Sequence, residues 1–114
     1  MAQQFQEQIL FQARPSTTDD TFVWQCPQFY TAVIHTIVIA NVTANAITYR
    51  LFANPSGKTF TVNNSLAYNV ALAGSASDSW VSLGGITYPA SFGVRTNTAS
   101  SLVITCFGTL MKTG

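Results

Sequence analysis

The sequence predicts an all-β fold, a single jelly-roll-like β-sandwich of about eight short strands with an N-terminal arm. Three observations support this prediction. The 114 residues are enough for one domain with its own core. Apolar and polar residues alternate with period two along most of the chain, as in strands. No segment keeps a helical period between caps, and turn formers recur about every 8–12 residues.

Residues 1–20 are interpreted as an arm with a first strand and a loop, and residues 21–114 as the sandwich domain. In the arm, Phe5, Ile9 and Phe11 alternate with glutamines, and "ARPSTTDD" is a loop rich in turn formers. We expect this Gln-rich arm to add a strand to the sheet edge of a neighbouring subunit. Deleting residues 1–13 should then weaken assembly and leave the fold intact.

The sequence in the middle of the chain predicts the central strands of the sheets. "TFVWQ" is a short strand stopped by Pro27, and residues 30–43, "YTAVIHTIVIANVT", are apolar on both faces and β-branched. Such a run is typical of a central strand that is covered on both sides. "AITYRLFA" then places Tyr49 and Arg50 on opposite faces of the next strand.

Residues 54–57, "NPSG", predict a tight hairpin turn, with Pro55 presetting φ and Gly57 accepting a positive φ. "KTFTV" is expected to be the following strand, and "LAYNVALA", "SWVSL", "FGVRT" and "SLVITCFGT" to complete the sandwich. Gly57-Lys58-Thr59 also matches the end of a phosphate-binding loop. That loop needs a glycine where this chain has Phe52, and a helix after it, so ATP binding is excluded.

Charge and composition favour a protein that lives inside an assembly. Charged residues make up 8% of the chain and the net charge is +1, so the surface is mostly neutral and tends to associate. The five basic residues are scattered, which argues against nucleic-acid binding.

We expect synthesis in the cytoplasm without a signal peptide, because residues 1–20 lack a basic segment followed by an apolar run. No membrane contact is expected, because the longest apolar stretch, residues 32–42, is too short to span a bilayer. Cys26 and Cys106 are expected to be reduced, partly buried thiols, with a disulfide as the less favoured alternative.

The inventory of reactive groups predicts no enzyme, no cofactor and no metal. His35 is the only histidine, and we expect it to be packed or at an interface. Asp19 and Asp20 are adjacent, and loop solvation or turn capping is favoured over a Ca²⁺ site because no third acid is near in sequence. The aromatic residues, including Trp80 and Tyr88, are expected to fill the core and an interface rather than form a sugar platform.

Several motifs together resemble a family of small virion structural proteins from tailed phages of the marine and cyanobacterial type. The motifs are Cys26-Pro27 after a short strand; Ile34, Thr36, Ile37 and Asn41; Tyr49-Arg50 followed by residues 54–57; residues 83–87; and residues 99–108. The resemblance covers about residues 5–109. One departure is the stretch at residues 89–91, where similar proteins often carry an Asp.

The resemblance implies a β-sandwich component of the virion, built in symmetric copies. We expect a capsid cement or decoration protein that contacts the major capsid protein as a homo-oligomer, with a trimer favoured. The alternatives are a tail, neck or baseplate accessory protein and, less favoured, a carbohydrate-binding module in host recognition. Arg50 and Arg95 lie between apolar neighbours and either pair across an interface or face solvent. The candidate interface residues are Phe5, Ile9, Phe11, Arg14, Arg50, Trp80 and Arg95.

Overall fold

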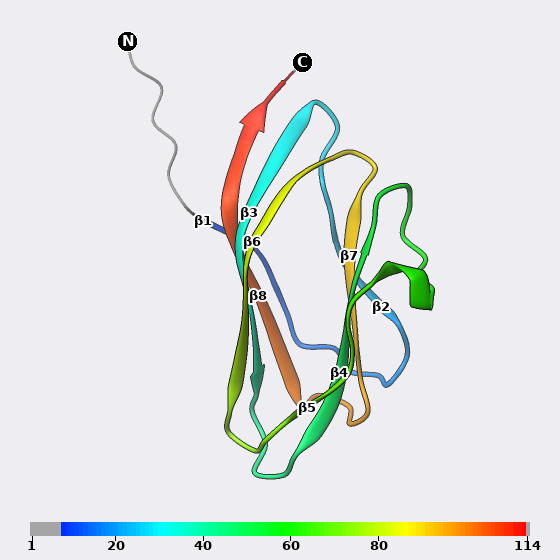
Figure 1. Cartoon of the computed structure of the whole chain (residues 1–114), viewed down its shortest axis with the longest axis vertical. Coiled ribbons are helices and arrows are strands. Elements are labelled where there is room, and N and C mark those ends of the chain that lie inside the picture. Colours follow the sequence, from blue (N-terminus) through cyan, green and yellow to red (C-terminus); the bar gives the residue numbers. More distant parts are fainter. Residues whose placement is uncertain (1–7, 114) are drawn as a thin grey trace.

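The computed structural model describes residues 8–113, and for residues 82 and 83 the backbone alone. Within this range the chain forms two antiparallel sheets packed face to face (Figure 1). The elements are β1 (Gln8–Ala13), β2 (Thr21–Gln25), β3 (Tyr30–Asn41), β4 (Ile47–Asn54), the short 3₁₀ helix η1 (Val62–Asn64), β5 (Ser65–Leu72), β6 (Ser77–Thr87), β7 (Ser91–Thr96) and β8 (Leu102–Lys112). The predicted all-β sandwich is therefore confirmed.

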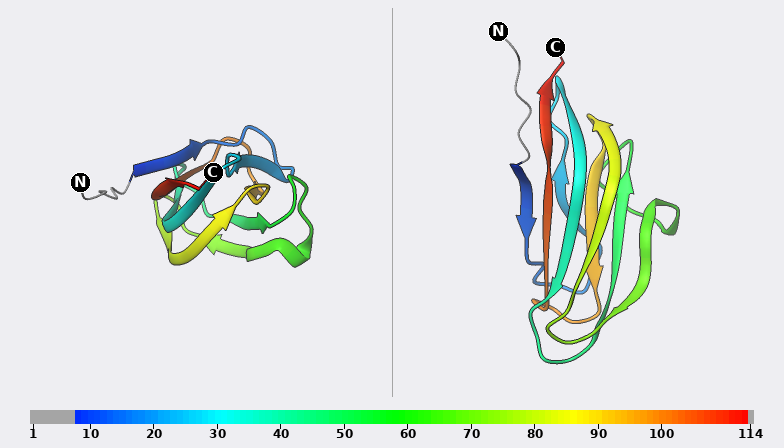
Figure 2. Two further views of the ribbon diagram at one scale, coloured as in Figure 1. Left: turned by 90° about the horizontal axis from the view of Figure 1, so that it is seen from above. Right: turned by 60° about the vertical axis from the view of Figure 1, so that its left-hand side comes forward.

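The order of the strands is that of a jelly roll. Sheet A runs β1-β8-β3-β6 and sheet B runs β2-β7-β4-β5. The antiparallel partners are nested, β1 with β8, β2 with β7, β3 with β6 and β4 with β5, as if one long hairpin had been rolled up. Figure 2 shows the two layers from above, with the strands of each sheet side by side.

The described part of the arm belongs to the sandwich. Strand β1 pairs with β8, and Phe11 lies opposite Cys106 with 8% of its surface exposed. Its ring stacks on Trp24 of β2 at a centroid distance of 5.5 Å, so it closes the core between the two sheets. A deletion of residues 1–13 would remove this side chain, and the expectation that such a deletion leaves the fold intact does not fit the packing. Phe5 lies outside the described residues.

The core lies between the sheets and is mainly aliphatic, with the rings of Phe11, Tyr49 and Phe92 also buried in it. Its fully buried side chains include Ile34, Ile37 and Ile104 from sheet A and Leu51 from sheet B. Cys26 and Cys106 are both buried free thiols, as expected from the sequence. Burial raises the pKa of Cys106 to about 12 and also raises the pKa of Cys26, so both remain protonated and weakly nucleophilic at neutral pH.

One polar network crosses the core and joins the sheets. The Tyr49 hydroxyl on β4 donates to Oδ2 of Asp78 on β6 at 2.6 Å, and accepts a hydrogen bond from Nε1 of Trp80 at 3.1 Å. Burial, and then the Asp78 carboxylate, raise the pKa of Tyr49, so the tyrosine stays a neutral donor. The network fixes Trp80 against the core as a half-buried side chain.

Strand β3 is central, as predicted, but only one of its faces is covered. Ala32 and Ile34 point into the core before a bulge at His35, and Ile37 and Ile39 do so after it. The bulge shifts the alternation of side chains by one residue, so each half of this apolar strand still points one row of side chains into the core. It leaves His35 exposed, so His35 is not packed in the core, and its expected place at an interface stays a prediction. None of the elements between residues 8 and 113 covers the outer face of β3.

The predicted strand at residues 58–62 is wrong, whereas the turn predicted at residues 54–57 is present at Pro55 and Ser56 but does not lead into such a strand. These residues form a wide loop between β4 and β5, residues 55–64, and Gly57 has no positive φ. Asn54 organises the loop, accepting from the Ser56 backbone N–H at 2.9 Å and donating to the Thr59 carbonyl at 2.5 Å. The loop thereby bends over the outer side of sheet B, where η1 is drawn in Figure 1.

Phe60 explains why this segment leaves the sheet. Its ring stacks on Phe52 at a centroid distance of 5.4 Å, on the face of sheet B that points away from the core. The ring stands over Gly93 of β7, where a Cβ atom would come within 2.3 Å of it. Burial of two aromatic rings therefore outweighs the strand propensity of the local sequence.

Candidate functional site

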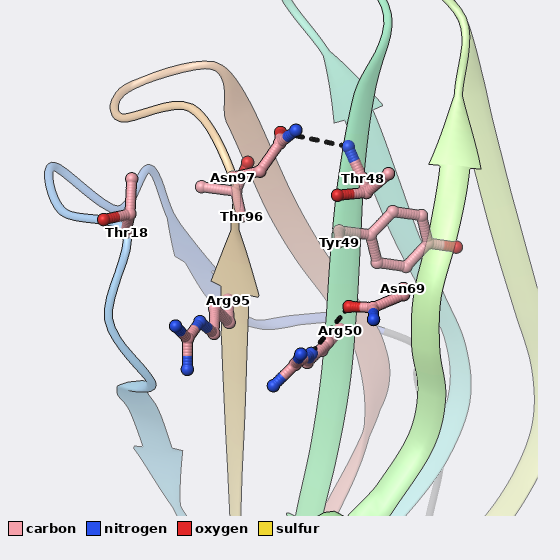
Figure 3. Close-up of a pocket in the computed structure, with 8 residues that line it drawn as sticks. All are labelled: Thr18, Thr48, Tyr49, Arg50, Asn69, Arg95, Thr96 and Asn97. Atoms are coloured by element: carbon pink, nitrogen blue, oxygen red, sulfur yellow. Dashed lines mark hydrogen bonds between the residues drawn. The ribbon is translucent and has the colours of Figure 1, made fainter.

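A polar pocket opens on the outer face of sheet B (Figure 3). Its volume is about 190 Å³. The pocket, called the arginine pocket below, is lined by Thr18, Thr48, Tyr49, Arg50, Asn69, Arg95, Thr96 and Asn97. These residues come from the loop before β2 and from β4, β5 and the end of β7.

Two arginines meet in this pocket because of the strand register. Arg50 of β4 lies directly opposite Arg95 of β7. The buried residues Tyr49 and Leu51 flank Arg50 and point into the core, so both arginines project from the outer side of sheet B, as Figure 3 shows. Like charges directly opposite one another destabilise a sheet. The direct opposition of Arg50 and Arg95 is therefore unfavourable unless other groups offset the repulsion between the two charges.

A bulge in β5 orients Arg50. Tyr49 and Leu51 pair with Val70 and Ala67, so two residues of β5, Tyr68 and Asn69, stand opposite the single Arg50. Bulges of this kind redirect side chains. Asn69 has a positive φ of 51°, and its Oδ1 accepts from Nε of Arg50 at 2.7 Å.

The face of the Arg50 guanidinium is also held, because its Cζ lies 4.1 Å from the centroid of the Tyr68 ring. One edge and one face of this guanidinium are therefore fixed. Among residues 8–113, no hydrogen bond joins its two Nη groups to another residue.

Arg95 makes a longer polar contact than Arg50 does. Its Nη1 lies 3.4 Å from Oδ1 of Asp20, in the loop before β2, with the two side chains 42% and 35% exposed. A long, exposed ion pair of this kind stabilises a protein by about 1 kcal/mol or less. The Asp20 carboxylate therefore faces an arginine, and the expectation that the Asp19-Asp20 pair serves the loop stays a prediction.

The remaining lining is polar and uncharged. The Thr48 backbone N–H donates to Oδ1 of Asn97 at 3.0 Å, which leaves the Asn97 amino group as a donor (Figure 3). Thr18 and Thr48 add hydroxyl groups. A pocket lined by two guanidinium groups and by amide and hydroxyl donors is suited to bind an anion, and the Asp20 carboxylate contacts one of these guanidinium groups.

The histidine and the two cysteines do not line the arginine pocket. Within residues 8–113 no three His, Cys, Asp or Glu side chains gather as metal ligands. His35 lies in sheet A, away from the arginine pocket in sheet B, and burial raises the pKa of both cysteines. No helix in this part of the chain is long and apolar enough to cross a membrane.

A second surface of interest is the outer face of sheet A. The register places four residues in one line across its strands, here called the apolar row: Ile9 of β1, Phe107 of β8, Thr36 of β3 and Val81 of β6. Ile9 is 57% exposed and Val81 is 64% exposed. Val38 and Val103, both half-buried, extend this surface. None of the described residues that alternate outward on this sheet is Asp, Glu, Lys or Arg.

A further pocket of about 270 Å³ lies between the ends of the two sheets. It is mostly apolar and is lined by Ala53, Asn54, Pro55, Gly85, Ile86, Thr87, Ala90, Ser91 and Phe92. The Ser91 hydroxyl beside it donates to the Gly57 carbonyl, which ties the β4–β5 loop to β7.

The candidate interface residues from the sequence fall into separate places. Ile9 is exposed on the apolar row, and Arg50 and Arg95 meet in the arginine pocket. Phe11 is a core residue, and Trp80 is engaged by Tyr49, so neither offers a large free surface.

Arg14 also has a local role. Its Nε donates to the Ser100 carbonyl at 2.8 Å, which ties the loop after β1 to the loop before β8. Any part that Arg14 plays at an interface would have to use the rest of its guanidinium.

Sequence reasoning missed Tyr68, Asn69, Val81 and Phe107. The one available signal for the pocket was an asparagine inside the strand pattern "LAYNVALA", since asparagine is depleted from strands and tolerates a positive φ. The apolar row gave no local signal, because its members lie on four different strands.

No protein-family model matches the chain, and no curated protein matches it at a significant level.

Proposed function

We propose that the chain is a structural protein of a tailed-phage virion, a cement or decoration protein of the capsid that works through symmetric protein–protein contacts. The observation that carries the proposal is the apolar row on sheet A. It forms an exposed β-sheet face with aliphatic and aromatic side chains and with no charged residue among those described.

Such a face favours contact with another copy of this chain. Contiguous exposed apolar surface marks interaction sites on soluble proteins. Two identical faces without charges can pack together without burying an unpaired ion, which would cost several kcal/mol per charge. The low overall charge of +1 adds little long-range repulsion between copies.

The fold is compatible with this proposal and with one competitor. Double-sheet jelly rolls occur in viral capsid proteins and in lectins, so the fold by itself does not decide between them. Trp80, a candidate sugar platform, is half-buried and its indole N–H is used by Tyr49. This use of Trp80 favours the structural function over a carbohydrate-binding module.

The first experiment measures the copy number of this protein per purified particle by quantitative mass spectrometry against the major capsid protein. A near-stoichiometric ratio supports a capsid covering. A few to a few dozen copies would move the protein to the tail, neck or baseplate, the alternative from the sequence. Absence from purified particles would overturn the virion proposal altogether.

A second experiment tests the sheet A contact by light scattering after size-exclusion chromatography. The full chain should form an oligomer, with a trimer favoured, and Val81→Arg should shift it to the monomer because it places a charge in the apolar row. Leu66→Arg is the matched control, a 41% exposed aliphatic residue on β5 of sheet B. A monomeric wild type at high concentration, or an unchanged oligomer in Val81→Arg, would refute this contact.

A further inference from the structure

We propose that the arginine pocket is a docking site for an acidic segment of a partner protein, whose carboxylate bridges Arg50 and Arg95. A planar guanidinium offers paired N–H donors that match the two oxygens of a carboxylate. Two such groups opposite each other on adjacent strands supply donors to both oxygens. Binding would also relieve the repulsion between the two positive charges.

Pre-organisation of Arg50 supports a ligand rather than simple solvation. An exposed arginine normally loses rotamer freedom when it binds, which weakens affinity. Here Asn69 holds Nε and Tyr68 holds one face, so this cost is largely met before binding. Asn69 lies at a bulge with a positive φ when it accepts the hydrogen bond from Arg50. Bulges and unusual backbone conformations are common at functional sites.

Asp20 indicates that a protein carboxylate can reach this pocket. Its Oδ1 contacts Arg95 alone, at 3.4 Å, and both side chains are partly exposed. That distance is longer than the 2.7–2.9 Å typical of a strong pair of this type. A partner carboxylate placed between the two arginines can therefore displace Asp20 at little cost.

The surroundings favour a peptide over a sugar or a nucleic acid. The Tyr49 ring points into the core, and Arg50 already covers one face of the nearby Tyr68 ring, where a sugar would stack. A polynucleotide needs a larger basic surface than two arginines, and the other three basic residues are elsewhere. Strand β5, which borders the pocket, is the edge of sheet B, and an extended peptide can pair with such an edge.

The partner's identity as a virion protein rests on the proposed function, whereas the carboxylate site does not. The experiment therefore uses the isolated full chain and a defined probe. NMR spectra of the ¹⁵N-labelled protein follow the arginine Nε–H and the backbone amide signals. The probe is an acetylated, amidated hexapeptide that carries two adjacent glutamates, and its glutamine counterpart is the control peptide.

We expect saturable shifts of the Nε–H signals of Arg50 and Arg95 with the glutamate peptide and none with the glutamine peptide. Arg50→Gln and Arg95→Gln should each raise the dissociation constant of the glutamate peptide at least about tenfold, as expected for the loss of a charge-assisted hydrogen bond. Lys112→Gln removes the same charge at an exposed position on β8 and should leave the constant within about twofold, since surface charges at a distance are screened.

Asp20→Asn is the sharper test, because a merely structural role would not predict it. Removal of the competing carboxylate should tighten peptide binding by about twofold to fivefold, since an exposed pair is worth little. Asp19→Asn changes the net charge equally but does not contact Arg95, so it should have a smaller effect. Thermal unfolding of each variant checks that the fold is kept.

The proposal is overturned if the shifts do not saturate, if the glutamine peptide binds equally well, or if the two arginine variants bind as tightly as wild type. Saturation by inorganic phosphate or sialyllactose at concentrations ten times lower than the peptide would assign the site to another ligand. Peptide binding by a protein that is absent from particles would leave this site standing and refute only the virion function.

Discussion

The two outer faces of the sandwich differ in how far other segments of the chain cover them. Sheet A presents the apolar row to the outside, with Ile9 and Val81 more than half exposed, and no described element lies over it. Sheet B is covered at one end by the β4–β5 loop, where Phe60 packs on Phe52, and carries the arginine pocket beyond it. The strands of both sheets show a similar alternation of apolar and polar residues. The difference therefore comes from the β4–β5 loop, which covers part of sheet B and has no counterpart on sheet A among the described residues.

Apolar side chains on the two outer faces are buried to different degrees. Phe52 points away from the space between the sheets, yet it is 2% exposed because the chain folds back over it. Phe107 occupies the corresponding side of sheet A and stays half-buried. The chain itself thus covers Phe52 on sheet B, although Phe22, Leu66 and Tyr68 of that sheet stay 41%, 41% and 47% exposed, whereas no described element covers the apolar row on sheet A.

The largest expected effect comes from removing the rings on each face. Phe52→Ala should lower the free energy of unfolding by about 3–5 kcal/mol, as for a buried aromatic side chain. Phe107→Ala should lower it by only about 1–2 kcal/mol in the monomer, because less of its surface is buried. Urea denaturation of both variants measures the difference. Equal losses would mean that the two faces are equally covered.

A smaller effect is expected at Gly93, which provides the space for Phe60. In Gly93→Val the new side chain meets the Phe60 ring, and the free energy of unfolding should fall by about 1–3 kcal/mol. Once Phe60→Ala has removed the ring, the same change should cost distinctly less, since residues in contact are not additive. A double-mutant cycle measures this coupling. Additive losses would contradict the close contact of ring and glycine.

The interior shared by both sheets should respond to alkaline pH. Burial raises the pKa of Cys106 from 9.0 to about 12, and the pKa of Cys26 and Tyr49 also rises. The folded chain therefore holds these protons more tightly than the unfolded chain. Stability is therefore complete below about pH 9 and should fall as the pH rises from about 9 toward 12, by about 1–2 kcal/mol between pH 9 and pH 10.

Denaturation at a series of pH values measures this loss, and Cys106→Ala should reduce its slope. A free energy of unfolding that stays level up to pH 10 would show that the thiols are not shielded as the structure indicates.

The smallest effect is expected for the charges on sheet B. Asp20→Asn and Arg95→Gln should each change the free energy of unfolding by no more than about 0.5 kcal/mol, because the pair is long and exposed. Arg50→Gln should be close to neutral, since it loses contacts with Asn69 and Tyr68 but also a like-charge neighbour. A loss above about 2 kcal/mol in Arg95→Gln would assign the pocket to folding rather than to binding.

The sequence by itself determined the fold class and most of the strands. Period-two alternation and turn residues are local properties, and they identified β2, β3, β4 and β5 within a few residues of their ends. The neutral composition likewise indicated a surface inclined to associate. The exception was residues 58–62, where the gain from burying Phe60 against Phe52 replaced a strand with a loop.

Only the tertiary structure decided where the candidate sites lie. Arg50 and Arg95 are neighbours because β4 pairs with β7, a contact between segments 45 positions apart whose register no local pattern specifies. The bulges at His35 and at Tyr68 and Asn69 set which side chains face outward, and they arise from the matching of whole strands. Alternation specifies that a residue faces one side of a strand, whereas the pairing of distant strands specifies what it meets there.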